Sequence, residues 1–463
     1  MKRRIAMISD HASPLADPGS VDSGGQNVYV AHISRRLAEM GYYVDVFTRR
    51  DNPLQPEIYK WDKGLRVIHV PAGPAEFRPK EELINYMPEF TAYMVDFINR
   101  DPHRYDLVHA HFWMSALLAI EIEQALGIPF VVTFHALGRV RRQHQGSSDG
   151  FPDLRFDIED RAVAEAEMII AECPQDVQDL TTLYHAEPNK LRVIPCGFDP
   201  TEMWPMDKSL ARLLLGIPAN EHVVLQLGRI VPRKGIDNAI RGFSRLVKNH
   251  DIPARLLIVG GDSETPDPKY TPEISRLKKV AAKEGVARKV QFIGRKTRHA
   301  LKYYYSAADV FISTPWYEPF GITPVESMAC GTPVIGSNVG GIKYTVEDGT
   351  TGFLVDPKDP DSLGEKLAYL YNHPEERKLM SKKAMDRANA HFTWDIVSES
   401  VSELYEEVLS NLPPAEEDRT EELLQAQVER RIAPDLIEPN TVQRDSQMLA
   451  DLFLPGTYEK GTQ

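Results

Sequence analysis

Short apolar runs alternate with amphipathic stretches along the chain from about residue 4 to residue 409. The runs are rich in Val and Ile with little polar alternation, which is typical of strands covered on both faces of a parallel sheet. Between them, apolar positions recur with helical spacing, as in residues 26–41. The pattern therefore predicts an α/β protein with parallel sheets.

The predicted strands fall into two groups, which indicate two doubly wound domains of nearly 200 residues each. In the first group they start at Arg4, Tyr43, Leu65, Asp106, Pro129, Met168 and Leu191, and in the second at His222, Arg255, Lys289, Asp309, Pro333 and Gly352. Residues 195–209 carry Pro, Gly and Asp without a clear period and are predicted to link the domains. A ligand would bind in the cleft between the domains, at the carboxyl ends of the strands.

These patterns predict a first domain over residues 1–200 and a second over residues 201–391. Residues 392–411 have a helical pattern, and the spacing leaves open whether this helix crosses back to the first domain. Residues 412–463 are charged, with no strong period at the end, and are expected to form an acidic, partly helical or disordered tail.

Composition narrows the function. The chain has 463 residues and a formal net charge of −13, which argues against a protein that coats nucleic acid. Three scattered cysteines favour a reducing compartment over a disulfide framework or zinc site. No run of 18 apolar residues predicts a transmembrane helix, and the N-terminus lacks the apolar stretch of a signal peptide. We therefore expect a cytoplasmic protein, with weak membrane association left open.

The first candidate motif is DSGGQN, residues 22–27, between a strand and a helix. Gly24 and Gly25 would let the backbone approach a ligand closely, and the N–H groups at the helix start would face an anion. An ordinary glycine-rich turn is an equal alternative. The motif is not G-x-G-x-x-G, which counts against a dinucleotide oxidoreductase.

Two cations follow the first strand of the second domain, in the segment GRIVPRKG, residues 228–235. Arg229 and Lys234 would face the cleft, where a pair of cations suits a diphosphate. A solvated basic loop is the ordinary alternative for such spacing.

Two glutamates, Glu318 and Glu326, stand seven residues apart in the segment EPFGITPVE. The predicted helix begins near Ile322, so Glu326 lies one turn inside it and can reach the same ligand. A carboxylate that accepts from two vicinal hydroxyls is a sensible clamp for a ribose or another sugar. Surface glutamates are the alternative, but the apolar neighbours indicate burial, and buried carboxylates need partners.

Further candidates lie in the first domain. His111 and His135 each close a Val-rich strand and would donate to a sugar hydroxyl, although a strand-end histidine is usually structural. The first domain also has five cationic side chains that either bind a phosphate of the second substrate or are simply solvated. They are Lys80, Arg139, Arg141, Arg142 and Arg155. The spacing indicates no metal site.

Together these motifs resemble the retaining, nucleotide-sugar-dependent glycosyltransferases of family four. That family includes sucrose synthase, sucrose-phosphate synthase and the inositol-phosphate N-acetylglucosaminyltransferase of mycothiol synthesis. The resemblance runs from Arg4 to about Leu409. It is most specific in the segment from Glu318 to Glu326, together with the GR and KG pairs of the basic segment at residues 228–235. It implies the GT-B fold, in which two Rossmann-like domains face each other.

The resemblance also implies donor roles. Arg229 and Lys234 would bind the donor diphosphate beside Gly25, and Glu326 would hold the ribose. Glu318 would hold the transferred sugar, with backbone amides of Phe320, Gly321, Ile322 and Thr323, and His135 would contact that sugar. The family transfers with retention by front-side attack, so no cofactor and no essential metal are expected.

Acceptor roles follow from two relatives. In AGPAEFRPKEEL, Lys80 matches an acceptor-phosphate lysine of the mycothiol enzyme, and Arg155 falls near its second phosphate-binding group. Phe112 and Ala136 stand where that enzyme has Tyr and Thr, while FHALGR is similar to sucrose-phosphate synthase. The carbonyl of Ala136 would lie near the anomeric carbon. The resemblance thus implies a small phosphorylated sugar or polyol acceptor.

Three functions stay open. The leading hypothesis is transfer of a sugar, with glucose from UDP-glucose favoured, to that phosphorylated acceptor. The second is a membrane-peripheral transferase with a lipid-linked or polymeric acceptor, which needs an exposed basic or apolar patch near residues 2–4 and 81–97. The third is a nucleotide-sugar sensor without activity. The sequence does not name the base, the acceptor or the oligomeric state.

Overall fold

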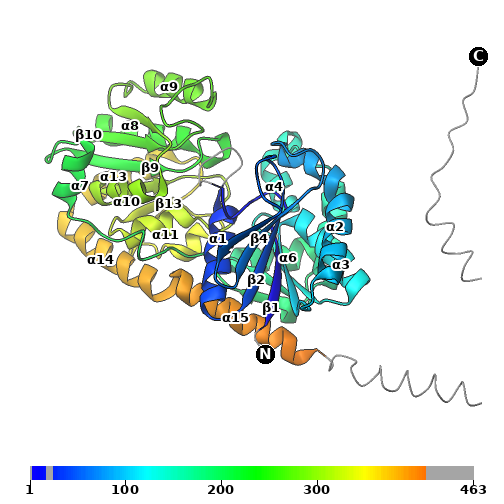
Figure 1. Cartoon of the computed structure of the whole chain (residues 1–463). Coiled ribbons are helices and arrows are strands. Elements are labelled where there is room, and N and C mark those ends of the chain that lie inside the picture. The colour runs from blue at the N-terminus through cyan, green and yellow to red at the C-terminus, as the bar shows by residue number, and fades with distance from the viewer. Residues whose placement is uncertain (1–2, 17–23, 413–463) are drawn as a thin grey trace, which may run out of the picture. The chain divides into compact units, whose positions relative to one another are not determined.

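The computed structural model describes residues 3–16 and 24–412. The predictions for Lys2, for Asp22 and Ser23 of the glycine motif, and for residues 413–463 of the tail lie outside the described residues. Residues Met1–Leu409 form one compact unit, which contains both predicted domains. Its two sheets and the helices on their faces are shown in Figure 1.

The first sheet has eight strands in the order β3-β4-β2-β1-β5-β6-β7-β8, and every pair is parallel except the antiparallel β3 and β4. Its order reverses between β1 and β5, where a doubly wound sheet leaves a crevice. The strands are β1 (Arg4–Ile8), β2 (Tyr43–Arg49), β3 (Ile58–Asp62), β4 (Leu65–Val70), β5 (Leu107–His111), β6 (Phe130–Thr133), β7 (Met168–Ala171) and β8 (Leu191–Val193).

The second sheet has six parallel strands in the order β11-β10-β9-β12-β13-β14. Its order reverses between β9 and β12, so both sheets place a switch point near the predicted ligand-binding loops. The strands are β9 (His222–Leu227), β10 (Ala254–Val259), β11 (Val290–Gly294), β12 (Val310–Ser313), β13 (Val334–Ser337) and β14 (Gly352–Val355).

Helices connect the strands and cover the sheets (Figure 1). On the first half these are α1 (Gly25–Glu39), α2 (Met87–Arg100), α3 (Trp113–Leu126), α4 (Gly138–Gln145), α5 (Leu154–Glu165) and α6 (Pro174–Tyr184), with short 3-10 turns at Lys80–Tyr86, Gly146–Ser148 and Pro188–Lys190. The rest are α7 (Lys208–Leu215), α8 (Ile236–Asn249), α9 (Glu273–Lys283), α10 (Arg298–Ala307), α11 (Ile322–Ala329), α12 (Ile342–Thr345), α13 (Pro360–Asn372), α14 (Pro374–His391) and α15 (Trp394–Asn411), with a 3-10 turn at Pro232–Lys234.

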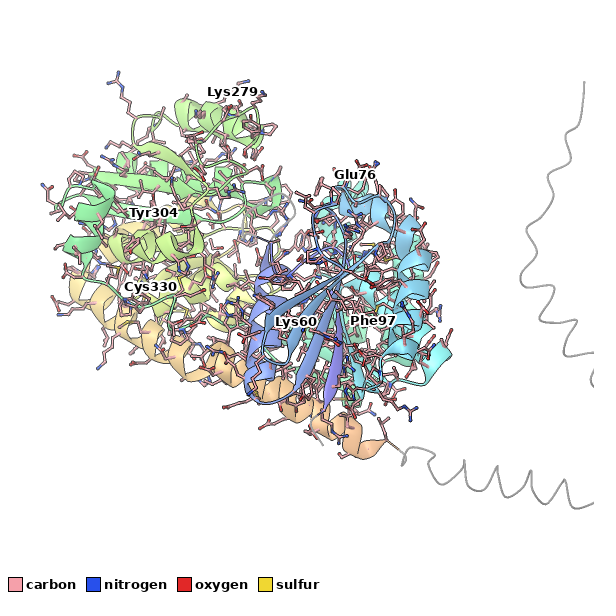
Figure 2. The ribbon with its side chains drawn as sticks, in the orientation of Figure 1. Lys60, Glu76, Phe97, Lys279, Tyr304 and Cys330 are labelled. Atoms are coloured by element: carbon pink, nitrogen blue, oxygen red, sulfur yellow. The ribbon has the colours of Figure 1, made fainter. Side chains whose placement is uncertain are left out.

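The strand predictions hold because the central strands are buried along their whole length, as β1 and β9 show. Strand β3 was not predicted. It lies at the edge of the sheet and is mostly exposed, so it lacks the apolar run that marks the others. Lys60, labelled in Figure 2, is one of its exposed residues. Edge strands often carry such polar residues, so a prediction based on continuous apolar runs does not identify them.

The helix α15 packs against the first sheet although it follows the second in sequence. The hydroxyl of Tyr405 lies 2.6 Å from Nδ1 of His109 on β5, and Tyr42 bonds both Ser402 and Glu406. The chain passes between the halves twice, and the two passages pair in a short parallel bridge between Phe198 and Thr393.

The membrane hypothesis required an exposed patch near residues 2–4 and 81–97. Arg4 instead lies buried in ion pairs with Asp45 and Asp101. Phe90 and Phe97 of α2 are buried in the core, where their burial contributes to stability. Among the described residues, no helix has the length and apolar character needed to span a membrane.

Candidate functional site

A cavity of about 350 Å³, here called the main cavity, is lined by loops at the carboxyl ends of both sheets. Fourteen of the sixteen predicted site residues line it, whereas His111 and Arg139 do not. The fourteen are Gly24, Gly25, Lys80, His135, Ala136, Arg155, Arg229, Lys234, Glu318, Phe320, Gly321, Ile322, Thr323 and Glu326. The fold thus brings residues some 300 positions apart in sequence into one lining.

The glycine motif ends at the first turn of α1. Gly24 is the residue before the helix, and its N–H donates to the side chain of Asn27 at 2.9 Å. A side chain on Gly25 would approach Ile322 of α11, so its absence leaves room in the cavity. The N–H groups of the first helical turn have no partner within the helix, which makes this end suited to an anion.

The basic loop after β9 is held against the end of β12. Gly235 has a φ of 63°, and a Cβ there would lie 1.9 Å from the carbonyl oxygen of Thr314. Only glycine fits this close approach, which fixes Lys234 and the start of α8. Lys234 then forms an ion pair with Glu318, and Arg233 lies 3.6 Å from the same carboxylate oxygen.

This ion pair alters both groups. Burial would raise the pKa of Glu318, but the Lys234 ammonium and Arg233 hold that pKa below its usual value. Burial lowers the pKa of Lys234, and Glu318 opposes the change. The two predicted donor ligands are therefore partners of each other, and Glu318 already accepts from one of the three N–H groups that Lys234 could offer to an anion.

Glu326 lies on α11 and is only 2 % exposed. Its two oxygens accept from Arg298 at 2.8 Å and from the hydroxyl of Tyr305 at 2.9 Å. Arg298 also pairs with Glu202 of the segment between the domains. The sequence analysis missed Arg298 and Tyr305, because their positions on α10 have no motif of their own.

His135 has a φ of 57°, an uncommon backbone conformation for a residue other than glycine. Phe112, also in the lining, has a φ of 85°. Two strained residues at one cavity are typical of a functional site. The Nδ1 atom of His135 lies 2.7 Å from Oε1 of Glu172, and its Nε2 atom lies 3.0 Å from Nδ1 of His111.

His111 was predicted to bind the acceptor, but its side chain is completely buried behind His135. Burial lowers the pKa of His111, and the neighbouring His109 and His135 lower it further. A neutral His111 can donate through Nδ1 to His135 while His135 donates to Glu172. His111 therefore contacts His135 rather than the cavity, and Glu172 at the end of β7 is a site residue that the sequence analysis missed.

Arg155 is 1 % exposed and bonds the Oε1 atom of Glu159 at 2.7 Å and the carbonyl of Ala136 at 2.5 Å. Its Nη1 atom is buried and makes no hydrogen bond with any described residue. Its guanidinium lies 4.9 Å from the ring centres of Phe112 and Phe151. A buried N–H group without a partner is costly, so Nη1 is a hydrogen-bond donor left over after the bonds of Arg155 to Glu159 and Ala136.

Arg139 was predicted to bind the acceptor, but it does not line the main cavity. Arg139 forms two hydrogen bonds with Asp160 and lies 4.6 Å from the ring of Tyr184. These contacts hold it away from the main cavity. Arg141, which was considered with it, does line the cavity and pairs with Asp149.

In residues 3–16 and 24–412, no three His, Cys, Asp or Glu side chains cluster in a way that could hold a metal ion.

Comparisons with known proteins agree with this arrangement. Residues 23–202 match the Glycosyltransferase Family 4 model, and residues 210–387 match that of Glycosyl transferases group 1. The D-inositol 3-phosphate glycosyltransferase of Acidothermus cellulolyticus is 38% identical over 413 residues, which cover 88% of this chain and 91% of the relative. That of Corynebacterium jeikeium is 35% identical over 416 residues, which cover 89% and 97%.

A solved structure is similar over the same region. The sucrose-phosphate synthase from Thermosynechococcus elongatus superposes with a TM-score of 0.81 at 31% identity, and the match covers 89% of this chain and all 100% of that one. Two parallel-sheet α/β domains, two matching family models and relatives covered over almost their whole length lead to one conclusion. The chain belongs to glycosyltransferase family 4 and has the GT-B fold.

Proposed function

We propose that the protein transfers glucose from UDP-glucose to a small phosphorylated polyol or sugar, with retention of the anomeric configuration. The observation that carries the proposal is the presence of two cationic clusters in the main cavity. Arg229 and Lys234 lie in the loop after β9, and Lys80 and Arg155 belong to the first half of the chain. A reaction that joins a diphosphate donor to a phosphorylated acceptor requires two such sites.

The donor half of the cavity matches the parts of a nucleotide sugar. The diphosphate would lie between Arg229, Lys234 and the helix start at Gly25, where backbone N–H groups and cations offset its charge. Glu326 is fixed by its two partners in an orientation that suits the ribose hydroxyls. The sugar would then lie against Glu318 and His135.

The transfer requires no group beyond these. The bond between the anomeric carbon and the diphosphate oxygen breaks, and the acceptor hydroxyl oxygen bonds the same carbon from the same face. The acceptor proton passes to the departing phosphate oxygen. Charge on that oxygen would be stabilised by Lys234 and by the amides of Ile322 and Thr323 at the start of α11.

The acceptor half supports a phosphorylated substrate. The unpaired Nη1 atom of Arg155 supplies a buried donor, and Lys80 and Arg141 add charge in the same lining. The names of the relatives point the same way, since they specify D-inositol 3-phosphate and sucrose phosphate. The phosphate, rather than the polyol ring, is the part of the acceptor that this site is built to bind.

The test is a UDP-release assay with pairs of acceptors that differ only in phosphate. We expect turnover of UDP-glucose with inositol 3-phosphate or fructose 6-phosphate, and little with free inositol or fructose. Proton NMR of the product should show the α configuration of the donor. Turnover with ADP-glucose alone would overturn the donor assignment, and equal rates with unphosphorylated acceptors would overturn the acceptor class.

A further inference from the structure

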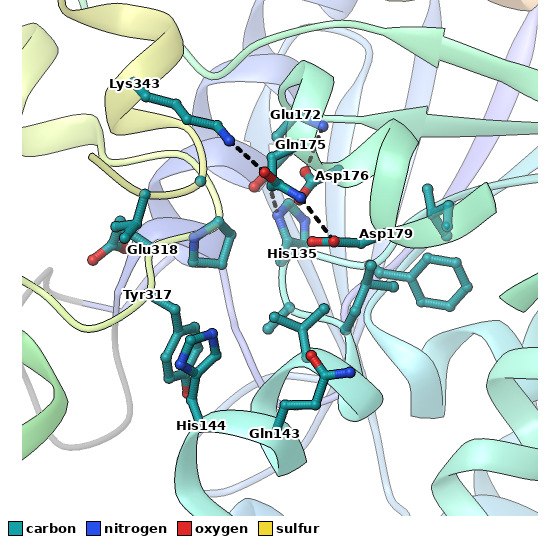
Figure 3. Close-up of a pocket in the computed structure, with 18 of the residues that line it drawn as sticks. His135, Gln143, His144, Glu172, Gln175, Asp176, Asp179, Tyr317, Glu318 and Lys343 are labelled. Atoms are coloured by element: carbon teal, nitrogen blue, oxygen red, sulfur yellow. Dashed lines mark hydrogen bonds and ion pairs between the residues drawn. The ribbon is translucent and has the colours of Figure 1, made fainter. Parts of the chain in front are cut away.

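A second cavity of about 320 Å³ adjoins the main cavity at the predicted position of the transferred sugar (Figure 3). The two linings share a wall that comes from the ends of β6 and β7 and from the loop before α11. The shared residues are His135, Ala136, Glu172, Tyr317, Glu318 and Pro319. A sugar bound against His135 and Glu318 therefore has one edge toward the second cavity.

The two cavities have opposite charge. The main cavity is lined by nine Arg and Lys residues and four carboxylates. The second cavity is lined by Glu172, Asp176, Asp179, Glu318 and a single lysine, Lys343. Glu318 is neutralised by its partner Lys234, which belongs to the main cavity. Glu172 and Asp179 together outweigh the one lysine and leave the second cavity with a net negative charge.

The single lysine offsets only part of this negative charge. Lys343 donates to the side chain of Gln175 at 2.5 Å, and Gln175 in turn donates to Asp179 at 2.9 Å (Figure 3). Asp176 accepts from the backbone N–H of Glu172 at 2.9 Å. Burial raises the pKa of Asp176, and the nearby Glu172 adds to that effect, so Asp176 favours its neutral form. Burial also raises the pKa of Asp179, but Gln175, Lys343 and His144 oppose the rise, so Asp179 is the residue of α6 that carries the charge.

An aromatic wall completes the second cavity. The rings of His144 and Tyr317 stack with centres 4.8 Å apart, and Gln145 donates to the Tyr317 hydroxyl. Trp316 also contributes to the lining. Carboxylate and amide acceptors beside flat apolar rings suit the hydroxyl groups and C–H face of a neutral sugar. They do not suit an anionic group.

We infer that the second cavity selects the donor by the charge of its sugar, accepting a neutral hydroxylated edge and rejecting a carboxylated or phosphorylated one. The inference rests on the proposed function, because that function places the sugar at His135 and Glu318. Asp179 is the specificity-determining residue, and it acts by like-charge repulsion across a partly buried space. The diphosphate and the acceptor phosphate remain on the basic side.

The experiment measures Kd by calorimetry for UDP-glucose and UDP-glucuronate, which differ by one carboxylate on the sugar. We expect the wild-type protein to bind UDP-glucuronate at least about tenfold more weakly. Asp179→Asn keeps the acceptor oxygen for Gln175 and removes the charge, so the ratio of the two Kd values should fall at least about fivefold. Lys343→Met should raise the ratio.

A matched control is Asp361→Asn, which removes one carboxylate from an exposed residue outside both cavities. Its Kd ratio should equal that of the wild type. If Asp179→Asn folds poorly, Lys343→Met tests the same charge balance, through the rise in the ratio that it should cause. Equal Kd values for the two donors in the wild type, or an unchanged ratio in both Asp179→Asn and Lys343→Met, would overturn the inference alone. Absence of binding by any UDP-sugar would overturn the proposed function as well.

Discussion

The Nδ1 atom of His111 lies 3.0 Å from the Nε2 atom of His135, at the ends of the neighbouring strands β5 and β6. Because the other nitrogen of His135 bonds Glu172, both ring nitrogens of His135 are occupied. The ring is thereby fixed in the shared wall of the two cavities. His111 is a positioning residue, since it acts on the sugar site only through His135.

The His111→Phe variant should lower kcat about tenfold and leave the KM for UDP-glucose nearly unchanged, because His135 loses its neighbour's N–H but the diphosphate site remains. Steady-state kinetics check this split. His111→Gln keeps an N–H donor and should restore most of kcat. The exposed His103→Gln serves as the control. A rise in KM without a fall in kcat would show that His111 does not orient the catalytic wall.

Because Lys234 and Glu318 form an ion pair, substitutions at these two residues should change the free energy of unfolding and the affinity for UDP-glucose in different ways. Lys234→Met leaves Glu318 buried without its main partner, so the free energy of unfolding should fall by about 3–5 kcal/mol. Adding Glu318→Gln removes the unpaired charge and should recover most of that loss in urea denaturation. Neither variant should recover the affinity for UDP-glucose, measured by calorimetry. Full donor affinity in the double variant would contradict the assignment of Lys234 to the diphosphate.

The acceptor cluster predicts a substrate-specific defect. Lys80→Met removes one cation from the acceptor half and should raise the KM for the phosphorylated acceptor by about 10- to 100-fold. The Kd for UDP-glucose should stay within about twofold, because the donor half is unchanged. Lys60→Met, on the exposed strand β3, loses the same charge elsewhere and should behave like the wild type. Equal loss of donor and acceptor affinity would argue against separate phosphate sites.

Buried neutral histidines predict that the protein loses stability as pH falls. Burial lowers the pKa of His109 to about 3, and it lowers that of His222 to about 4. In the unfolded chain these groups titrate near pH 6.5, so below that pH the unfolded state binds protons that the folded state does not. Each group should reduce the free energy of unfolding by up to about 1.4 kcal/mol per pH unit between pH 6.5 and its folded pKa.

Urea denaturation at pH 7.5, 6.5 and 5.5 measures this slope. His109→Gln removes one of the groups, so its free energy of unfolding should fall less steeply below pH 6.5 than that of the wild type. Parallel curves for the two proteins would mean that His109 does not contribute to the pH dependence.

The sequence predicted the elements whose burial pattern is simple. Strands such as β9 are continuous apolar runs because helices cover both sheet faces, and the glycines around Gly235 mark the loops between them. The edge strand β3 escaped notice because its exposed face carries no such run. Local periodicity reports burial, and an edge strand has little of it.

Candidate site residues could be predicted where several stand close together in sequence, as Glu318 and Glu326 do, and the structure places both in the lining of the main cavity. Partners from other elements were missed, including Arg298, which orients Glu326, and Glu172, which orients His135. Arg139 was predicted to bind the acceptor but lies outside the lining of the main cavity, and nothing in its segment reveals the carboxylate of Asp160 that it bonds. Glu172 had one usable signal, because it follows a buried strand directly.

The return of α15 to the first sheet has a practical consequence for protein engineering. Tyr405 supports the histidines at the end of β5, so the half of the molecule that contains the first sheet is assembled from two separate stretches of the chain. A chimera that exchanges only the donor half between two relatives must therefore change parent twice, once near Phe198 and again near Thr393. A chimera with a single crossover would place His109 of one parent against α15 of the other. The contact between His109 and Tyr405 would then have to form between residues of different parents.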